Sequence, residues 1–180
     1  MVVVNMFGVP GAGKSTGTAY VFSMLKMLGY NCELISEFAK DKVWEGNKTV
    51  FENQAYIFGK QSYRQSRCDG KVDILLTDSP LPLSIMYNHD HRLTENFNLT
   101  VMDVFNSYEN LNFLIDRVKP YNPAGRHQTE SESDALKGDV ENLLKERDIF
   151  YIRVPGNLDG YDYIVKTLKD YMESKKNEEL

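Results

Sequence analysis

The residues best suited to chemistry form a glycine-rich segment near the start of the chain, Gly8-Val9-Pro10-Gly11-Ala12-Gly13-Lys14-Ser15. The segment matches the pattern G-x-x-x-x-G-K-[ST] in full, and it lies between an apolar run and a helical stretch, as that pattern requires. Glycines allow backbone N–H groups to turn toward phosphate oxygens, and the N-terminus of the following helix favours an anion. The segment therefore predicts a site for the phosphates of a nucleotide.

Two side chains of this segment have specific expected roles. Lys14 should place its charge on the β- and γ-phosphates, and the Ser15 hydroxyl should join the Mg²⁺ shell. The residues expected to hold the nucleotide are Gly8, Pro10, Gly11, Ala12, Gly13, Lys14, Ser15 and Thr16. ATP and Mg²⁺ are the expected cofactors, with ATP as the default over GTP.

A first carboxylate follows the apolar run Val72–Thr77, which reads as a strand. Ligands bind at the carboxyl edge of an open parallel sheet, so Asp78 should lie where a carboxylate orients Mg²⁺. The alternative is that Asp78 caps the turn that begins at Ser79-Pro80.

A second carboxylate, Glu37, follows the predicted strand Asn31–Ile35 in the same way. A kinase that acts on a hydroxyl benefits from a carboxylate that accepts the departing proton. Glu37 is the first candidate for this role, and Asp41, one helical turn further on, is the second. Alternatively, Glu37 only complements the dipole of the helix it begins.

The segment 117–128 carries three cations between a predicted strand and a predicted helix. The planar guanidinium group of arginine suits the equatorial oxygens of a transferring phosphoryl group. We therefore expect a lid at about 117–128 that supplies Arg117 and Arg126 and excludes water. A solvated basic loop is the alternative.

The stretch Thr49–Cys68 reads as one long helix with two different faces. Phe51, Ala55 and Phe58 share a face that we expect to pack on the core. Gln54, near the start of the helix, is a candidate polar contact to the acceptor.

The opposite face of this helix is basic. It carries Lys60, Arg64 and Arg67 at helical spacing. Arg64 and Arg67 are candidates for holding the backbone phosphates of a nucleic acid acceptor. A charge run of this kind is more often a plain solvated face.

Strands and helices alternate along the chain. The predicted strands are 2–7, 31–35, 72–77, 111–115 and 149–154. The predicted helices are 14–28, 37–44, 49–68, 83–88, 94–108, one that begins at Thr129, and 158–172, after which the tail should be frayed. Ser36 is the expected N-cap of the helix 37–44, and Thr129 and Glu132 should form a capping box. Such alternation predicts a parallel sheet covered on both faces. The expected fold is an α/β three-layer P-loop NTPase with a five-stranded parallel sheet, in a single domain over 1–180.

Composition narrows the class of protein. The chain has 180 residues, a formal charge of −5 and 42% hydrophobic residues, which is ordinary for a globular protein and argues against a broad nucleic acid footprint. Cys32 and Cys68 read as reduced thiols. We see no signal peptide and no run long enough to span a membrane, so we expect a soluble, cytoplasmic protein without a membrane partner. The oligomeric state is not predictable.

These segments occur in an order that resembles a known family. The ones that carry the resemblance are Gly8–Ser15, Ser36-Glu37-Phe38-Ala39-Lys40-Asp41, Asn53-Gln54, Thr77-Asp78-Ser79-Pro80, Tyr121-Asn122-Pro123-Ala124-Gly125-Arg126 and Gln128-Thr129-Glu130. Together they resemble the small P-loop kinases related to ribosylnicotinamide kinase, over residues 2 to about 155. The phage-encoded branch is more similar; it looks as if it includes the 5-hydroxymethyluracil DNA kinases.

The resemblance implies a nucleoside-monophosphate-kinase-like fold and a phosphotransferase. Lys14 and Ser15 would act on the phosphates and metal, Glu37 or Asp78 at the acceptor hydroxyl, and Arg117 and Arg126 in the lid. The implied acceptor is the hydroxymethyl group of 5-hydroxymethyldeoxyuridine in DNA, extruded or single-stranded. The acidic net charge of the chain contrasts with such a partner.

Other functions remain open from the residues alone. A free-nucleoside or ribosylnicotinamide kinase would use the same phosphate loop with a closed pocket for a small molecule. A nucleotide-driven ATPase switch would need no acceptor. A degenerate nucleotide-binding module is disfavoured, because Lys14, Ser15 and Asp78 are all present.

Overall fold

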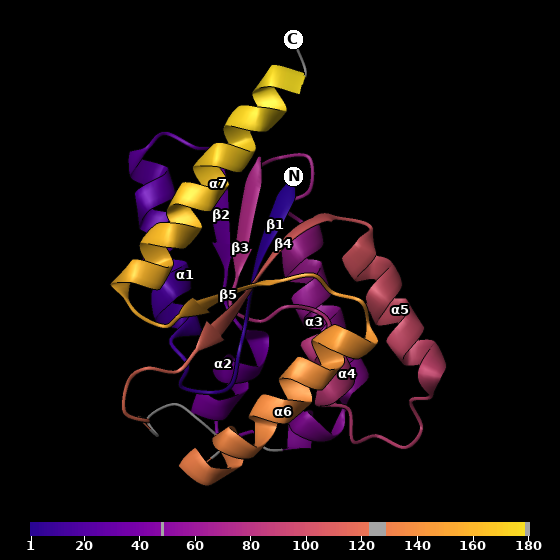
Figure 1. Ribbon diagram of the computed structural model, residues 1–180. Coiled ribbons are helices and arrows are strands. Elements are labelled where there is room, and N and C mark those ends of the chain that lie inside the picture. The colour runs from indigo at the N-terminus through magenta and orange to yellow at the C-terminus, as the bar shows by residue number, and fades with distance from the viewer. Residues whose placement is uncertain (48, 123–128, 179–180) are drawn as a thin grey trace.

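The computed structural model describes residues 1–47, 49–122 and 129–178, which place a parallel sheet between two layers of helices (Figure 1). The strands are β1 (Val2–Phe7), β2 (Cys32–Ile35), β3 (Ile74–Thr77), β4 (Glu109–Asp116) and β5 (Ile152–Pro155). The helices are α1 (Lys14–Met27), α2 (Phe38–Trp44), the 3₁₀ helix η1 (Thr49–Glu52), α3 (Gln54–Ser66), α4 (Leu83–Met86), α5 (Glu95–Asn106), α6 (Glu130–Glu146) and α7 (Leu158–Glu178). The five-stranded α/β fold predicted from the sequence is confirmed.

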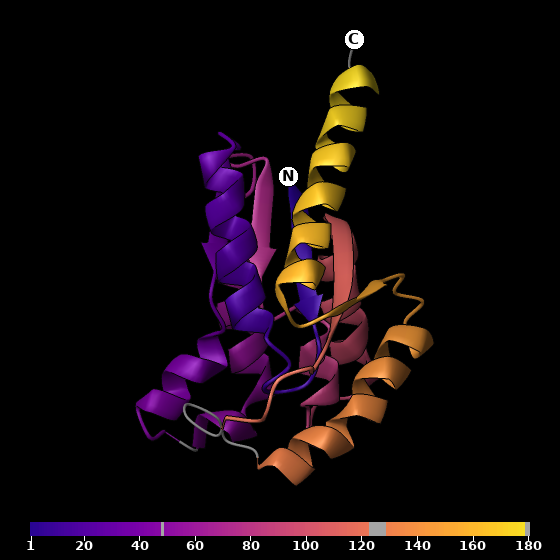
Figure 2. The same ribbon diagram turned by 60° about the vertical axis from the view of Figure 1, so that its left-hand side comes forward.

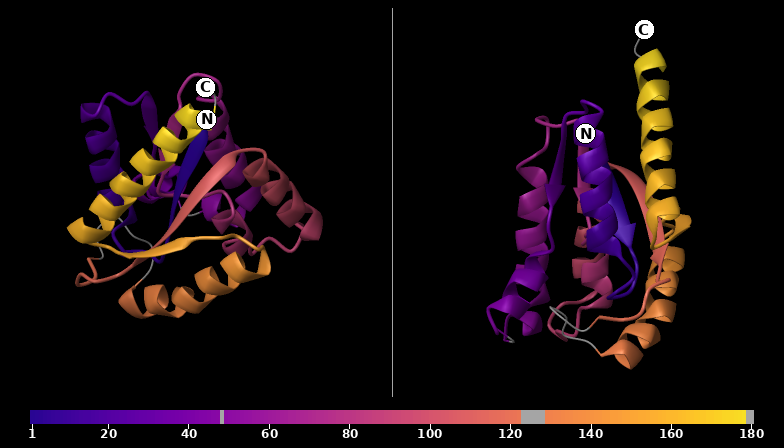
Figure 3. Two further views of the ribbon diagram at one scale, coloured as in Figure 1. Left: turned by 45° about the horizontal axis from the view of Figure 1, so that its top comes forward. Right: turned by 90° about the vertical axis from the view of Figure 1, so that its left-hand side faces the viewer.

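The strands lie in the order β2-β3-β1-β4-β5, and every pairing is parallel. Helices α1 and α7 pack together on one face, and α3, α4, α5 and α6 form the layer on the other (Figure 3). All six residues of β1 are buried, as expected for the central strand of a sheet covered on both faces.

One polar side chain interrupts this apolar strand. The Asn5 amide donates to the Asn110 side-chain oxygen at 2.9 Å and to that of Asn112 at 3.0 Å, both on the neighbouring strand β4. A buried polar group needs such partners, so these bonds favour the observed register of β1 on β4.

Because the strands are parallel, their carboxyl ends meet at one edge of the sheet. Figure 2 shows the strand arrows pointing to the end of the molecule where α2 and the first turns of α6 lie. The residues that follow the strands at this edge are Gly8, Ser36, Asp78, Arg117 and Gly156. Ligands bind at this edge in open α/β sheets.

The long helix predicted over Thr49–Cys68 is wrong in one respect, because the structure divides it. The 3₁₀ helix η1 ends at Glu52, and α3 begins at Gln54 after Asn53. The Asn53 side chain accepts a hydrogen bond from the Tyr56 N–H at 3.0 Å, so it acts as an N-cap that starts a new helix.

The break also overturns the predicted core face. Ala55 is exposed and Phe51 and Phe58 are only partly buried, whereas the buried residues of α3 are Gln54, Ile57, Gln61 and Gln65. The helical spacing counted from Phe51 does not continue through the cap at Asn53. Gln61 can be buried because its side-chain oxygen accepts the Phe38 N–H at 2.9 Å.

Two helix ends also differ from the prediction. Glu37, not Ser36, is the residue before α2, and it makes no side-chain cap; the Ser36 carbonyl instead accepts from the Arg64 guanidinium at 3.0 Å. Helix α7 extends to Glu178 and projects past the sheet (Figure 1), where Tyr171 and Lys175 bond to the Glu109 carboxylate of β4. Local sequence does not reveal such tertiary partners.

Other local predictions are confirmed. Thr129 and Glu132 form the expected capping box at the start of α6. Cys32 and Cys68 are free and buried. Among the described residues, no helix is both long enough and apolar enough to cross a membrane.

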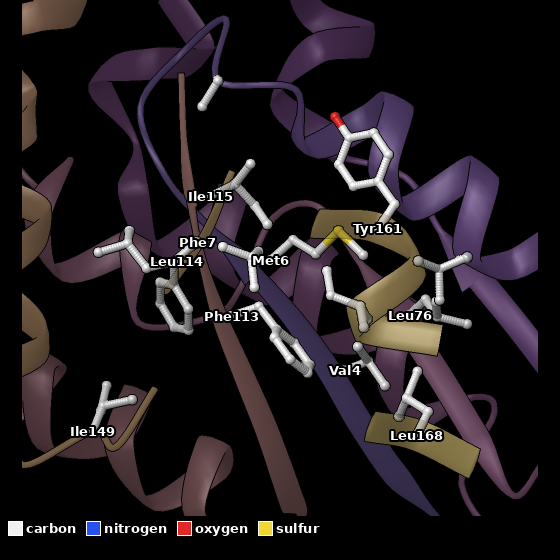
Figure 4. Packing of buried hydrophobic residues seen from close by; sticks show 14 of the residues in the cluster. Val4, Met6, Phe7, Leu76, Phe113, Leu114, Ile115, Ile149, Tyr161 and Leu168 are labelled. Carbon is white, nitrogen blue, oxygen red and sulfur yellow. The ribbon is translucent and has the colours of Figure 1, made fainter. Parts of the chain in front are cut away.

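The main hydrophobic core joins α1 and α7 to the central strands (Figure 4). Tyr161 of α7 is almost fully buried, and its hydroxyl donates to the Gly13 carbonyl at 3.0 Å. Its ring lies over Gly17 of α1, where a Cβ atom would come within 2.5 Å of Tyr161 Cε1. The absence of a side chain at Gly17 therefore lets the tyrosine reach the start of α1.

We predict that Gly17→Ala destabilises the protein by about 1–3 kcal/mol, because the added methyl group overpacks against the Tyr161 ring. The matched control is Gly59→Ala in α3, where an added Cβ meets nothing within 4 Å. That change should stabilise by about 0.5–1 kcal/mol through helix propensity. Urea unfolding measures both, and equal effects of the two substitutions would contradict this account of the core.

Candidate active site at the phosphate loop

The loop between β1 and α1 has the backbone of a phosphate cradle. Gly8, Gly11 and Gly13 have φ values of 140°, 82° and 106°, which residues with a Cβ rarely adopt. The Ala12 N–H donates to the Val9 carbonyl at 3.1 Å, and α1 begins immediately afterwards at Lys14. The loop and the helix N-terminus together favour an anion at this position.

Segments distant in sequence hold this loop in place. Ser133 of α6 is fully buried and donates its hydroxyl to the Pro10 carbonyl at 2.7 Å. Gly156, which follows β5, lies so close that a Cβ there would come within 2.1 Å of the Ala12 carbonyl oxygen. The loop is thus fixed from the sheet side as well as by Tyr161 of α7.

Lys14 extends over the loop that precedes it. Its Nζ donates to the Gly8 carbonyl at 2.7 Å and to the Val9 carbonyl at 3.1 Å. Lys14 also lines a cavity that lies beside the loop. Its position therefore supports the predicted contact with phosphate oxygens at the mouth of the loop.

Ser15 and Asp78 come together as a candidate metal site. The Ser15 hydroxyl donates to Asp78 Oδ2 at 2.5 Å, while the buried Asp78 Oδ1 has no hydrogen-bond partner among the described residues. A carboxylate and a hydroxyl are oxygen ligands of the kind that Mg²⁺ binds. The described residues contain no group of three or more His, Cys, Asp or Glu side chains suited to a metal. Since Mg²⁺ commonly takes one or two carboxylates and completes its shell with phosphates and water, these residues fit it.

A cavity of about 460 Å³ extends from the phosphate loop to helices α2, α3 and α4. Gly13, Lys14 and Ser15 border one end, with Asp78 and Glu37 beside them. The far walls combine apolar with polar side chains. The apolar ones are Val43, Phe51, Ile57, Pro80 and Leu83, and the polar ones are Lys40, Gln54, Gln61, Ser84, Tyr87 and His89. A cavity of this size that combines apolar side chains with polar groups can hold a small molecule.

Glu37 is the acidic side chain placed at the junction of the two ends. It makes no hydrogen bond or ion pair with any described residue, and it lines the cavity. Burial raises the pKa of the Glu37 carboxyl above its ordinary value; Lys14 opposes the shift and Asp78 adds to it. A carboxylate with a raised pKa is better suited to accept a proton near neutral pH.

The predicted lid is described only in part. The Arg117 guanidinium is ion-paired with Asp134 and lies 3.7 Å from Glu130, both in α6, and it does not border the main cavity. It stacks at 5.4 Å over the ring of Tyr121, which itself lies against Gly11 of the phosphate loop. Arg126 lies outside the described residues.

The candidate acceptor residues separate into two groups. Gln54 is buried and lines the cavity. Asp41 and Arg64 instead pair with each other at 2.6 Å, and Arg67 lies exposed on α3; these three do not line the cavity.

Sequence reasoning missed Ser84 and Tyr87, which line the cavity from the short helix α4. Their spacing of three residues, directly after the turn that carries Asp78, is the signal that could have found them.

Comparisons with known proteins agree with this geometry. The sequence pattern of the AAA domain family matches residues 3–159, so the chain belongs to that family. No curated protein matches the chain.

Solved structures share the fold. A deoxyadenosine kinase from M. mycoides with bound dATP is 20% identical, with a TM-score of 0.56 over 94% of this chain and 100% of that one. The same enzyme with the products dCMP and dCDP is 19% identical, with a TM-score of 0.55 over 96% of this chain and 99% of that one. The structure of APE1195 is 18% identical, with a TM-score of 0.52 over 96% of this chain and 95% of that one. The P-loop NTPase-like fold, similar to that of deoxyadenosine kinase, is thereby established.

The raised pKa of Glu37 gives a prediction for stability. Its charged form is disfavoured in the folded protein, so the fold loses stability as pH rises through the raised pKa and regains it below the unfolded value of about 4.5. Glu37→Gln should therefore raise the thermal unfolding midpoint at pH 7 and change it little at pH 4. The control is Glu52→Gln at an exposed site on η1. An unchanged or lower unfolding midpoint at pH 7 for the Glu37 variant would contradict a raised pKa of Glu37 in the folded protein.

Proposed function

We propose that this member of the AAA domain family is an ATP-dependent kinase that acts on a hydroxyl of a nucleoside-type acceptor. The observation that carries the proposal is one cavity that runs from the phosphate loop to a chamber lined by both apolar and polar side chains, with Glu37 and Asp78 between them. Its fold likeness to a deoxyadenosine kinase supports a nucleoside as the acceptor. The family alone is also compatible with a plain ATPase.

In this proposal, the acceptor hydroxyl lies between Glu37 and the γ-phosphate. Its oxygen forms a bond to the γ-phosphorus while its proton passes to the Glu37 carboxylate. The bond from the γ-phosphorus to the β,γ-bridging oxygen breaks, and ADP leaves. Lys14 stabilises the charge that develops on the phosphate oxygens.

Ser15 and Asp78 would hold Mg²⁺, which when bound neutralises charge on the β- and γ-phosphates. Arg117 belongs to the proposed lid at 117–128, together with Arg126. To reach the phosphates, Arg117 would have to leave its ion pairs with Asp134 and Glu130. Closure of the lid would then exclude water, which otherwise competes with the acceptor.

A finer proposal is that the acceptor nucleoside belongs to DNA, with the hydroxymethyl group of 5-hydroxymethyldeoxyuridine as its target. The outer face of α3 supports it, because residues 53–68 contain no acidic side chain in a chain of net charge −5. Lys60, Tyr63 and Arg67 are exposed along this face, and an aromatic side chain among cations suits a nucleic acid strand. Arg64 contributes less, since Asp41 already neutralises it.

The alternatives are a free-nucleoside or ribosylnicotinamide kinase and an ATPase switch. The cavity suits a free nucleoside equally well, since DNA would have to deliver an extruded or single-stranded base. An ATPase switch has no use for the chamber beyond Glu37. ATP turnover with and without nucleosides or DNA separates these functions, because a switch hydrolyses ATP at the same rate in the absence of any acceptor.

We predict that Lys14→Ala and Asp78→Asn each lower phosphoryl transfer by about 10²–10³-fold, because each removes stabilisation of transition-state charge. Transfer of the labelled γ-phosphate from ATP to nucleosides and to DNA, with and without 5-hydroxymethyluracil, measures the effect. Lys26→Ala, on an exposed part of α1, is the control. Wild-type turnover in the Lys14 variant would show that the phosphate loop is not the active site.

The DNA proposal has its own test. Charge reversal by Lys60→Glu and Arg67→Glu together should weaken phosphorylation of DNA by at least about tenfold and spare any free nucleoside, because only a strand needs the outer face of α3. Two reversals of the same sign on α7, Lys166→Glu and Lys176→Glu, control for net charge. If both pairs of changes lower DNA phosphorylation equally, α3 is not a specific docking face.

A further inference from the structure

Helix α4 forms a polar wall of the cavity that the proposed chemistry does not yet use. Ser84 and Tyr87 are three residues apart, so they lie on one side of the chain, and both face the cavity. Helix α4 begins at Leu83, shortly after Asp78, and the Tyr87 N–H donates to the Leu83 carbonyl at 3.0 Å, so one helical turn carries both hydroxyls. The two hydroxyls are therefore held near the junction where Glu37 and Asp78 lie.

Neither hydroxyl has a hydrogen-bond partner in the described part of the chain, although other side chains surround both. Ser84 is only 7% exposed, and Tyr87 is half-buried. Buried hydroxyls nearly always find a partner in a finished site. Gln54, on the facing helix α3, is 4% exposed and likewise lacks a partner among the described residues. Two helices thus present unpaired polar groups to the same cavity.

Tyr87 lies close enough to Glu37 to sense its charge. Burial, and in second place the Glu37 carboxylate, raise the pKa of the Tyr87 hydroxyl far above its ordinary value. The phenol consequently stays protonated at any working pH and can both donate and accept a hydrogen bond. A donor held beside the proposed base is well placed to orient an acceptor.

We propose that Ser84 and Tyr87 bind the nucleoside-type acceptor, holding a second polar group of it so that its reacting hydroxyl faces Glu37. This inference rests on the proposed function. The acceptor that fits has an apolar ring body against Ile57 and Leu83, one polar edge toward Gln54 and another toward α4. A nucleoside has all of these features, whereas water or a bare phosphate has none of the apolar body.

The alternative is that Tyr87 merely fills space, in which case its hydroxyl contributes nothing to binding. Tyr87→Phe and Ser84→Ala separate the two possibilities, because each removes one hydroxyl and keeps most of the packing. Tyr163→Phe is the matched control, since Tyr163 is 50% exposed on α7 and does not border the cavity.

Calorimetric titration of each variant with the four deoxynucleosides, the four ribonucleosides and 5-hydroxymethyldeoxyuridine, in the presence of a non-hydrolysable ATP analogue, measures acceptor binding. We expect each cavity variant to bind the best nucleoside about three- to tenfold more weakly, the loss of one hydrogen bond. Affinity for the ATP analogue and the thermal unfolding midpoint should match those of the wild type. Nucleoside affinities within twofold of the wild type in both variants, or an equal loss of affinity for the analogue, would overturn the inference.

The same titrations separate this inference from the proposed function. If the wild type binds a nucleoside but transfers no phosphoryl group to it, the proposed kinase activity fails while the Tyr87→Phe and Ser84→Ala affinities still decide the role of α4. If the wild type binds none of these nucleosides and phosphorylates neither them nor DNA, the inference and the proposed function are both overturned.

Discussion

Close backbone packing around the phosphate loop is the constraint on which the site depends. The loop uses glycines at positive φ, and such a backbone keeps one shape only when its surroundings hold it. Here Gly156 packs against the Ala12 carbonyl, Ser133 bonds to Pro10, and Tyr161 bonds to Gly13. These contacts come from the end of β5 and from two helices, so elements distant in sequence fix the shape of the candidate phosphate site.

The fold and the position of the phosphate-loop residues in the candidate site were predictable because their signals are local. The phosphate-loop pattern, the β-branched run before it and the carboxylate after β3 each lie within a few residues, and parallel topology then brings them to one edge. Arg117 shows where this reasoning ends. Its residue type suggests a lid, but its partners Asp134 and Glu130 in α6 are not visible in the local sequence.

The lining of the cavity beyond the phosphate loop was harder to predict, because it depends on where helix α3 begins. The cap at Asn53 starts a new helix, and the buried face of α3 consists of Gln54, Ile57, Gln61 and Gln65, where the sequence had predicted Phe51, Ala55 and Phe58. The same restart places Gln54 in the cavity and leaves Lys60, Tyr63 and Arg67 outside. The cap at Asn53 thus sets which residues of α3 face the cavity and which lie on its basic outer face.

The central claim is that one cavity holds both the triphosphate and the acceptor, with Glu37 between them. A crystal structure with a bisubstrate analogue, in which a polyphosphate joins adenosine to a second nucleoside, tests it most directly. The account predicts the polyphosphate on residues 8–15, the second nucleoside between α3 and α4, and the linking oxygen within hydrogen-bond distance of the Glu37 carboxylate. A polyphosphate bound away from the loop, or a second nucleoside outside the cavity, would contradict it.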